Sequence, residues 1–306
     1  MPRADLGLFY RHSGRFPAWG LLLLVGGGSL VAWPVGLLYG AATVFFPFVQ
    51  LTALLTAAVA LGLGWLARGL ALRGKIRNTP VVAAGGGLIG LTALVAAWTG
   101  WVAALSWGRP TLWLFLPSEL FRFAGAVWSQ GVWSVGSGGP VRGWPLVAVW
   151  SVEALLLVLP VVLVPAHAVA RRPFSEGADA WAREERLLPP LTFLPPEARP
   201  AFVDRLRAGD FGVLASLEPV GEEAPAWTRY RVRSVEAEPD AAFLTVTTAE
   251  SRATGAGDLL VEHACLARNL VIDGGSLELL EEIAAAPDGP PDASGRVTRS
   301  GEVAST

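Results

Sequence analysis

The stretch that decides the fold runs from residue 18 to residue 67 and reads AWGLLLLVGGGSLVAWPVGLLYGAATVFFPFVQLTALLTAAVALGLGWLA. These fifty residues contain no Asp, Glu, Lys or Arg. A bilayer core about 30 Å thick is crossed by roughly 20 helical residues. The run is therefore long enough for two membrane-spanning helices, and lipid is the expected solvent for this part of the chain.

The whole chain divides into two parts of different charge. With 52% hydrophobic and 16% charged residues, it is too apolar for an ordinary soluble domain. Residues 1–170 hold ten Arg and Lys against three Asp and Glu, a balance of +7, whereas residues 171–306 hold fourteen against twenty-three, a balance of −9. We therefore expect a membrane part joined near Arg171 to a hydrophilic part.

The predicted fold class is a membrane all-α bundle of four transmembrane helices followed by a small α+β cytoplasmic domain. Spans are expected at about 19–38, 46–66, 81–105 and 144–169, with Gly40 and Pro47 interrupting the helix between the first two. The expected divisions of the chain are an N-terminal segment at 1–17, a transmembrane domain at 18–170 with an outer loop at 106–143, a cytoplasmic domain at 171–286 and a disordered tail at 287–306.

The positive residues predict the orientation of the spans, because Arg and Lys at span ends favour the cytoplasmic side. One side of the four-span layout carries Arg3, Arg11, Arg15, Arg68, Arg73, Lys75, Arg77, Arg171 and Arg172, and the other carries Arg109, Arg122 and Arg142. Both termini are therefore expected in the cytoplasm. A cleaved signal peptide is the alternative for the first span, but "VAWPVG" at 31–36 lacks a small-x-small cleavage site.

The outer loop contains a segment of helical character after Pro117. Ser118 is a candidate cap, and Leu120, Phe121, Phe123 and Val127 recur at helical spacing. Such a helix is expected to lie in the outer leaflet with its apolar face down, and a lid or a partner-docking surface is the alternative.

Glu153 is the candidate functional residue of the membrane part. It stands in "WSVEALLLVLPVVLV" at 150–164, about 13 Å into the fourth span. A carboxylate at such a depth costs roughly 3 kcal/mol, so it should face protein or water. The alternatives are a structural hydrogen bond to a Thr or Trp of a neighbouring span, a proton or ion pathway, and a misplaced span.

Other apparent motifs point to packing instead of chemistry. "GGGLIG" at 85–90 matches the dinucleotide pattern G-x-G-x-x-G, but it lies inside an apolar span, where small residues let helices approach closely. His12, His167 and His263 do not form an evident metal set, and Cys265, the only cysteine, is expected to be a buried small side chain. We expect no metal and no cofactor.

Four short segments carry a family resemblance: "FPAW" at 16–19, "GKIRN" at 74–78, "WSVEA" at 150–154 and "PFSEGADAW" at 173–181. With them the chain resembles a group of uncharacterised bacterial multi-pass inner-membrane proteins whose cytoplasmic motif reads P-F-C-E-x-C-x-x-W. Ser175 and Ala178 stand where those proteins have cysteines. The resemblance implies a bacterial inner (plasma) membrane location, and no activity comes with it.

A second Ser-x-x-Ala occurs at Ser234 and Ala237. Two Cys-x-x-Cys pairs would complete a tetrahedral zinc site. One hypothesis is therefore that Ser175, Ala178, Ser234 and Ala237 mark a degenerate zinc-ribbon-like hairpin that has lost its ligands, and coincidence is the alternative.

The remaining pattern of the hydrophilic part predicts helices at 175–188, 196–210 and 276–286. Segments 230–237 and 241–250 are expected to form a hairpin through 238–241, and 259–273 a strand or strand pair.

The acidic balance of this domain argues against nucleic-acid or peripheral lipid binding, which call for a basic face. The sequence thus favours a non-enzymatic scaffold, adaptor or sensor that sits in a lipid bilayer and binds another protein. The alternative is a membrane transporter or a membrane-embedded enzyme that uses Glu153.

Overall fold

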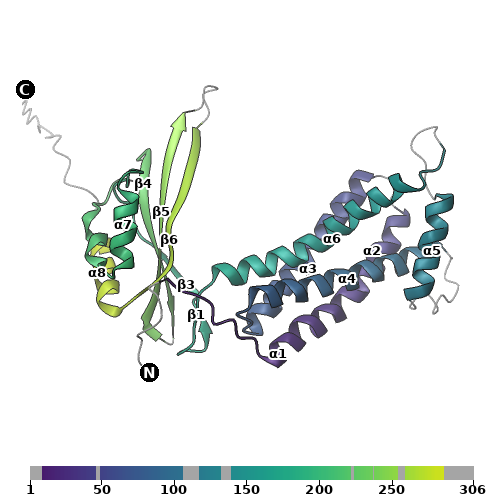
Figure 1. Cartoon of the computed structure of the whole chain (residues 1–306), viewed down its shortest axis with the longest axis horizontal. Coiled ribbons are helices and arrows are strands. Elements are labelled where there is room, and N and C mark those ends of the chain that lie inside the picture. Colours follow the sequence, from purple (N-terminus) through teal and green to yellow (C-terminus); the bar gives the residue numbers. More distant parts are fainter. Residues whose placement is uncertain are drawn as a thin grey trace, which may run out of the picture. The chain divides into compact units, whose positions relative to one another are not determined.

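The computed structural model describes residues 9–45, 49–105, 117–131, 139–221, 224–236, 238–253 and 259–285 (Figure 1). The described residues form two compact units. One is helical and comprises residues from His12 to Phe174, and the other joins residues 9–11 to the chain from Ser175 onward.

Four long helical stretches make up most of the helical unit (Figure 1). The first is continuous through α1 (Ala18–Leu21), a π-helical segment η1 (Leu22–Gly27) and α2 (Gly28–Phe45), and the others are α3 (Val49–Arg73), α4 (Thr79–Leu105) and α6 (Trp144–Arg171). Each is long and apolar enough to cross a membrane. The expectation of four apolar helices is thus confirmed among the described residues.

Gly40 does not interrupt the first helix, contrary to the sequence expectation. The helix passes through it and ends at Phe45, and Pro47 lies outside the described residues. A lipid environment explains the difference, because an unpaired backbone group costs several kcal/mol there and a helix is retained where water would permit a break. The first helix therefore extends seven residues beyond the end of the span predicted at 19–38.

Small residues allow α4 to approach both α2 and α6 closely. A Cβ atom added at Gly36 would lie 2.4 Å from the carbonyl oxygen of Ala93, and one at Gly40 would lie 1.8 Å from that of Ala97. On the other side of α4, a Cβ at Gly86 would lie 2.3 Å from the carbonyl oxygen of Val161. These positions exclude any larger side chain, so packing is the role of the "GGGLIG" segment.

The predicted helix of the outer loop is present as α5 (Pro117–Gln130). It begins at Pro117, so Ser118 lies within its first turn and is not the cap. Phe123 contacts Trp101 with ring centroids 6.0 Å apart and Val127 is buried, whereas Phe121 is 77% exposed and lies on a different face. Residues 106–116 and 132–138 of the outer loop lie outside the described residues.

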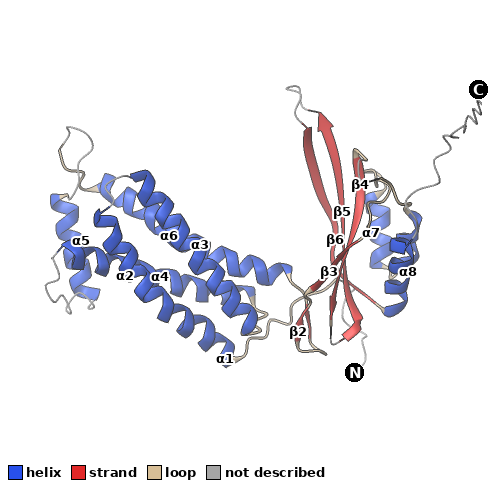
Figure 2. Cartoon of the chain, turned by 180° about the vertical axis from the view of Figure 1, so that it is seen from behind, coloured by secondary structure: helices blue, strands red, loops and turns tan. Residues whose placement is uncertain are grey.

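The second unit is built on an antiparallel sheet. Its four strands pair in the order β3 (Glu184–Leu187), β4 (Ala226–Val235), β5 (Glu238–Ala253) and β6 (Leu259–Ile272). The helices α7 (Arg199–Arg207) and α8 (Gly274–Ala285) lie on one face of this sheet (Figure 2). Tyr230, Val232 and Leu244 point into the core beneath them. The predicted α+β class is therefore confirmed for the described residues.

The prediction of a helix at 175–188 is wrong. Its residues form the two-stranded pair β1 (Phe174–Ser175) and β2 (Ala180–Trp181), followed by β3. Asp179 adopts a φ of 47° in the tight turn between β1 and β2, which no helix accommodates. The charged residues of this segment pair across strands, since Glu185 lies 3.2 Å from Arg231 and 2.9 Å from Arg233 of β4.

The other elements of the sheet unit agree more closely with expectation. α7 ends before Gly209, whose φ of 81° suits a helix terminus, and α8 is capped by Asp273, which accepts a 2.9 Å hydrogen bond from the amide of Ser276. The hairpin turn precedes Glu238, so 238–241 belong to β5, and β6 is one strand. The tail from Pro287 lies outside the described residues.

The N-terminal segment joins this sheet. Phe9 forms a bridge with Leu270 of β6, and the amide of Tyr10 donates a 3.0 Å hydrogen bond to the carbonyl of Asn269. The Tyr10 ring packs edge-on against Phe243 at 5.4 Å. Residues from both sides of the helical unit in sequence therefore complete one fold.

We expect Gly40→Ala to lower the free energy of unfolding by about 1–3 kcal/mol, because the new methyl group collides with the carbonyl of Ala97. Unfolding in mixed micelles, followed by circular dichroism, measures the change. Gly62→Ala is the matched control, since a Cβ at Gly62 in α3 meets nothing within 4 Å. Equal stability of the two variants would contradict the packing described.

Candidate functional site

Glu153 is part of a hydrogen-bonded cluster that links three of the long helices. The hydroxyl of Tyr39 in α2 donates to Oε1 of Glu153 in α6 over 2.7 Å. The same hydroxyl lies 2.7 Å from Oγ1 of Thr56 in α3. Thr56 in turn lies 2.8 Å from the carbonyl oxygen of Thr52, to which its own hydroxyl can donate. Glu153 therefore has polar companions from other helices.

The cluster is shielded unevenly. Tyr39 is 3% exposed and Thr56 is 2% exposed, whereas Glu153 is half-buried. Glu153 follows Trp144 by nine residues in α6, which places it about 13 Å along that helix. A carboxylate at this depth is stabilised by a hydroxyl that is itself held in place by a second hydroxyl.

The expected structural hydrogen bond exists, but its donor is a tyrosine. The sequence expectation named Thr or Trp, and Thr56 reaches Glu153 only through Tyr39. The sequence pattern did not identify Tyr39, because the predicted first span ends at residue 38. The signal that would have identified it is the uninterrupted apolar run through Gly40, which keeps Tyr39 inside the helix and turned toward the bundle.

Aromatic rings lie close to the cluster along the chain. Trp150, three residues before Glu153, packs edge-on against Trp98 at 4.8 Å, and Trp98 packs against Trp101 at 5.9 Å. The series continues to Phe123 of α5. These contacts join α4, α5 and α6 at one end of the bundle, so a wide opening there would require the rings to separate.

The segments of the zinc-ribbon hypothesis lie side by side in the sheet unit. The Ser175 hydroxyl donates to the carboxylate of Glu238, the first residue of β5, and the Ala178 amide donates to the Ser175 hydroxyl over 3.2 Å. Ala178 also packs against the small apolar cluster that contains Val235, the residue after Ser234. Ala237 lies outside the described residues, so the arrangement of all four positions stays a hypothesis.

No metal fits these residues as they stand, because Ser and Ala supply neither thiolate nor imidazole. Among the residues that the structure describes, no group of three or more His, Cys, Asp or Glu side chains is placed to hold a metal ion. Cys265 is exposed, and the expectation that it is buried is wrong. It lies opposite Thr247 in the ladder between β5 and β6.

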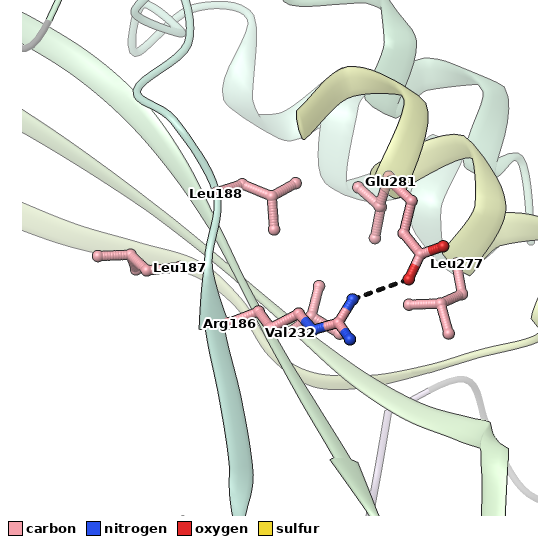
Figure 3. A pocket seen from close by; sticks show the side chains of 7 residues that line it. Arg186, Leu187, Leu188, Val232, Leu277 and Glu281 are labelled. Carbon is pink, nitrogen blue, oxygen red and sulfur yellow. Dashed lines mark hydrogen bonds and ion pairs between the residues drawn. The ribbon is translucent and has the colours of Figure 1, made fainter. Parts of the chain in front are cut away.

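An apolar groove of about 290 Å³ lies between β3 and α8 (Figure 3). Leu188, Val232 and Leu277 point into it, whereas Leu187 points away. At its rim, Arg186 and Glu281 form an ion pair of 2.9 Å. The groove can therefore receive an apolar side chain beside a pair of opposite charges.

No protein-family model, no curated protein and no solved structure matches the chain. The geometry of the two sites is therefore the basis for a functional proposal.

We expect Tyr39→Phe to cost about 1–3 kcal/mol of stability, because it removes the donor that serves the Glu153 carboxylate inside the bundle. Unfolding of the purified protein in bicelles measures the difference. Ser151→Ala is the control, since the exposed Ser151 hydroxyl donates within its own helix, to the Val147 carbonyl at 2.8 Å. If both variants lose the same small amount, the cluster does not stabilise the bundle.

Proposed function

We propose that this chain is an integral protein of a bacterial inner membrane, with both termini in the cytoplasm, that acts as a non-enzymatic adaptor, scaffold or sensor. Its cytoplasmic domain binds an extended segment of another protein at the edge of the sheet. The observation that carries this proposal is the groove between β3 and α8, which opens beside an edge strand.

The membrane location is supported by the four apolar helices. The orientation is supported by the nine cations on one side of the predicted layout. Pairing of Tyr10 with Asn269 adds support, because it joins the segment before the first helix to the domain after the last one. The two paired segments must lie on the same side of the membrane, which requires an even number of crossings between them. The bacterial inner membrane comes from the family resemblance.

β3 is suited to accept another strand. It is the terminal strand of the sheet, and the amide of Leu188, which follows β3, donates to the Tyr230 carbonyl of β4 over 3.0 Å. In an antiparallel pair, alternate residues direct their backbone groups to the partner strand. The N–H and C=O groups of Glu185 and Leu187 therefore point away from β4, where an added strand would meet them.

The groove supplies specificity for such a strand. An added strand at β3 gains main-chain hydrogen bonds from the edge, and its apolar side chain can enter beside Leu188 and Leu277. Leu187, which is 53% exposed, offers a second apolar contact on the opposite face. The binding partner is therefore an extended peptide with apolar residues on both faces.

Site-specific photo-crosslinking of the full chain in intact cells tests this proposal. A photoreactive amino acid in place of Leu187 should yield one adduct of defined mass, identified by mass spectrometry. The same group in place of Val261, 45% exposed on β6, should not. We expect Leu277→Lys to abolish the adduct at position 187, because the ammonium group interferes with an apolar side chain in the groove.

Glu278→Lys is the matched control for that change, since Glu278 is exposed on α8 and does not line the groove. It should leave the adduct intact. An adduct that persists in Leu277→Lys, or that forms equally at position 261, would contradict docking at β3.

A second candidate function is proton transfer through Glu153, and the cluster itself favours it. The oxygens of Glu153, Tyr39, Thr56 and the Thr52 carbonyl follow one another at hydrogen-bonding distances of 2.7, 2.7 and 2.8 Å. When Glu153 is ionised, Tyr39 donates to it. When Glu153 is protonated, each hydroxyl can turn and donate toward Thr52. Such reversal is the first requirement of a proton relay.

Proton flux into proteoliposomes tests this second candidate. The relay requires faster flux than in empty liposomes, and we expect Glu153→Gln to abolish the excess because an amide does not exchange a proton at this site. Ser151→Ala should retain the flux, since the exposed Ser151 hydroxyl donates to the Val147 carbonyl within α6. Flux equal to that of empty liposomes, or undiminished flux in Glu153→Gln, would exclude the relay.

A further inference from the structure

The last turns of α3 carry a stacked pair of side chains, Trp65 and Arg68. The Arg68 guanidinium lies 4.5 Å from the centre of the Trp65 ring. Trp65 is 60% exposed, so the pair lies on the outer surface of its helix. The ring restricts where the guanidinium group can go, because a cation is attracted to the face of an indole. The pair is therefore a positioned cation on an otherwise apolar helix.

The position of Arg68 along α3 matches the edge of a hydrocarbon layer. Residues 49–67 of this helix contain no charged side chain. From Val49 to Arg68 the helix rises about 28 Å, close to the roughly 30 Å of a bilayer core. Arg73 lies about 7.5 Å further along the axis, and the headgroup region on each side of a bilayer is about 5–7 Å thick. The two guanidinium groups therefore reach the level of the lipid phosphates.

Open space lies beside the stacked pair. A Cβ atom added at Gly62 or at Gly69 meets nothing within 4 Å. These glycines are seven residues apart, close to two helical turns, so they lie on one side of α3. Gly69 follows Trp65 by four residues and shares its face of the helix. The helix surface is therefore flat beside Trp65, and an acyl chain can approach the backbone there.

The carboxylates of the helical unit are engaged elsewhere. Residues 12–174 contain only two of them, in α5 and α6. Glu119 pairs with Arg122 of α5, and Glu153 accepts the Tyr39 hydroxyl over 2.7 Å. An anion for Arg68 must therefore come from outside this unit. Guanidinium recognises phosphate through paired N–H donors, and stacking on a ring occupies only the flat face of the group.

We infer that this end of α3 is a binding site for an anionic phospholipid. Arg68 and Arg73 contact its phosphate, and one acyl chain lies beside Trp65 over Gly69. A lipid is favoured over a soluble phosphate, because Leu61, 48% exposed, and Trp65 continue the apolar surface of α3 up to the cations. The inference rests on the membrane location proposed above, but it does not depend on the groove at β3.

Native mass spectrometry of the full chain in detergent tests the site, with phosphatidylglycerol and phosphatidylcholine of the same acyl chains as probes. We expect the first phosphatidylglycerol to bind about tenfold more tightly than phosphatidylcholine, because two cations face one anionic headgroup. Arg68→Gln should remove this preference. Arg122→Gln is the matched control, since it removes the same charge from α5 and should leave the preference unchanged.

A second pair of variants tests the open space beside Trp65. Gly69→Leu places a side chain where the acyl chain is expected, and it should weaken phosphatidylglycerol binding about tenfold through this clash. Gly125→Leu is the control, since a Cβ at Gly125 in α5 also meets nothing within 4 Å. Leucine is a better helix former than glycine, so both variants should keep the circular dichroism of the parent chain.

Equal affinity for the two lipids would overturn the inference. So would a preference that survives in Arg68→Gln, or losses of the same size in Gly69→Leu and Gly125→Leu. Displacement of the lipid by excess inorganic phosphate would show that a free phosphate is the ligand. A failure of the membrane assignment is seen separately, because the chain would then stay in solution without detergent, and the adduct at Leu187 reports on the β3 groove alone.

Discussion

Close helix packing inside lipid is the constraint on which the helical unit depends. Lipid tails are as apolar as leucine, so the hydrophobic effect does not drive one spanning helix against another. Contact between spanning helices must therefore come from complementary shape and from buried hydrogen bonds. Gly36 and Gly40 of α2 supply the shape against carbonyls of α4, and Gly86 of α4 does so against a carbonyl of α6. Tyr39, beside Gly40, supplies the hydrogen bonds. The packing and the polar cluster are therefore two parts of one arrangement.

The number of long apolar helices follows from the sequence because it depends only on local composition. The length of a charge-free run predicts how many helices can cross a bilayer, and this prediction does not depend on which helices are neighbours. The partner of Glu153 does not follow in this way. Gly40 is a helix breaker in water and a packing residue in lipid, and the two roles place Tyr39 either in a loop or in the bundle. Only the contact with Ala97 decides between them.

The same reasoning explains the sheet unit. The hairpin of β4 and β5 has the alternation that a strand requires, and α8 has a helical pattern with a capping Asp273, so both were predicted from local signals. The segment at 175–188 has good helix formers and is nevertheless extended. Its decisive interactions are with residues some fifty positions away, such as the pairing of Glu185 with Arg233. Local propensity is a weak guide where distant partners decide the structure.

The pairing of Phe9 and Tyr10 with β6 has a consequence for biogenesis. These residues precede all four long helices in the chain, and Asn269 and Leu270 follow them. All four long helices are synthesised in between. The edge of the sheet therefore closes only after translation has passed the final strand, and the emerging N-terminal segment must wait unpaired until then. A change that displaces Phe9 would leave this edge of β6 without its bridge at Leu270.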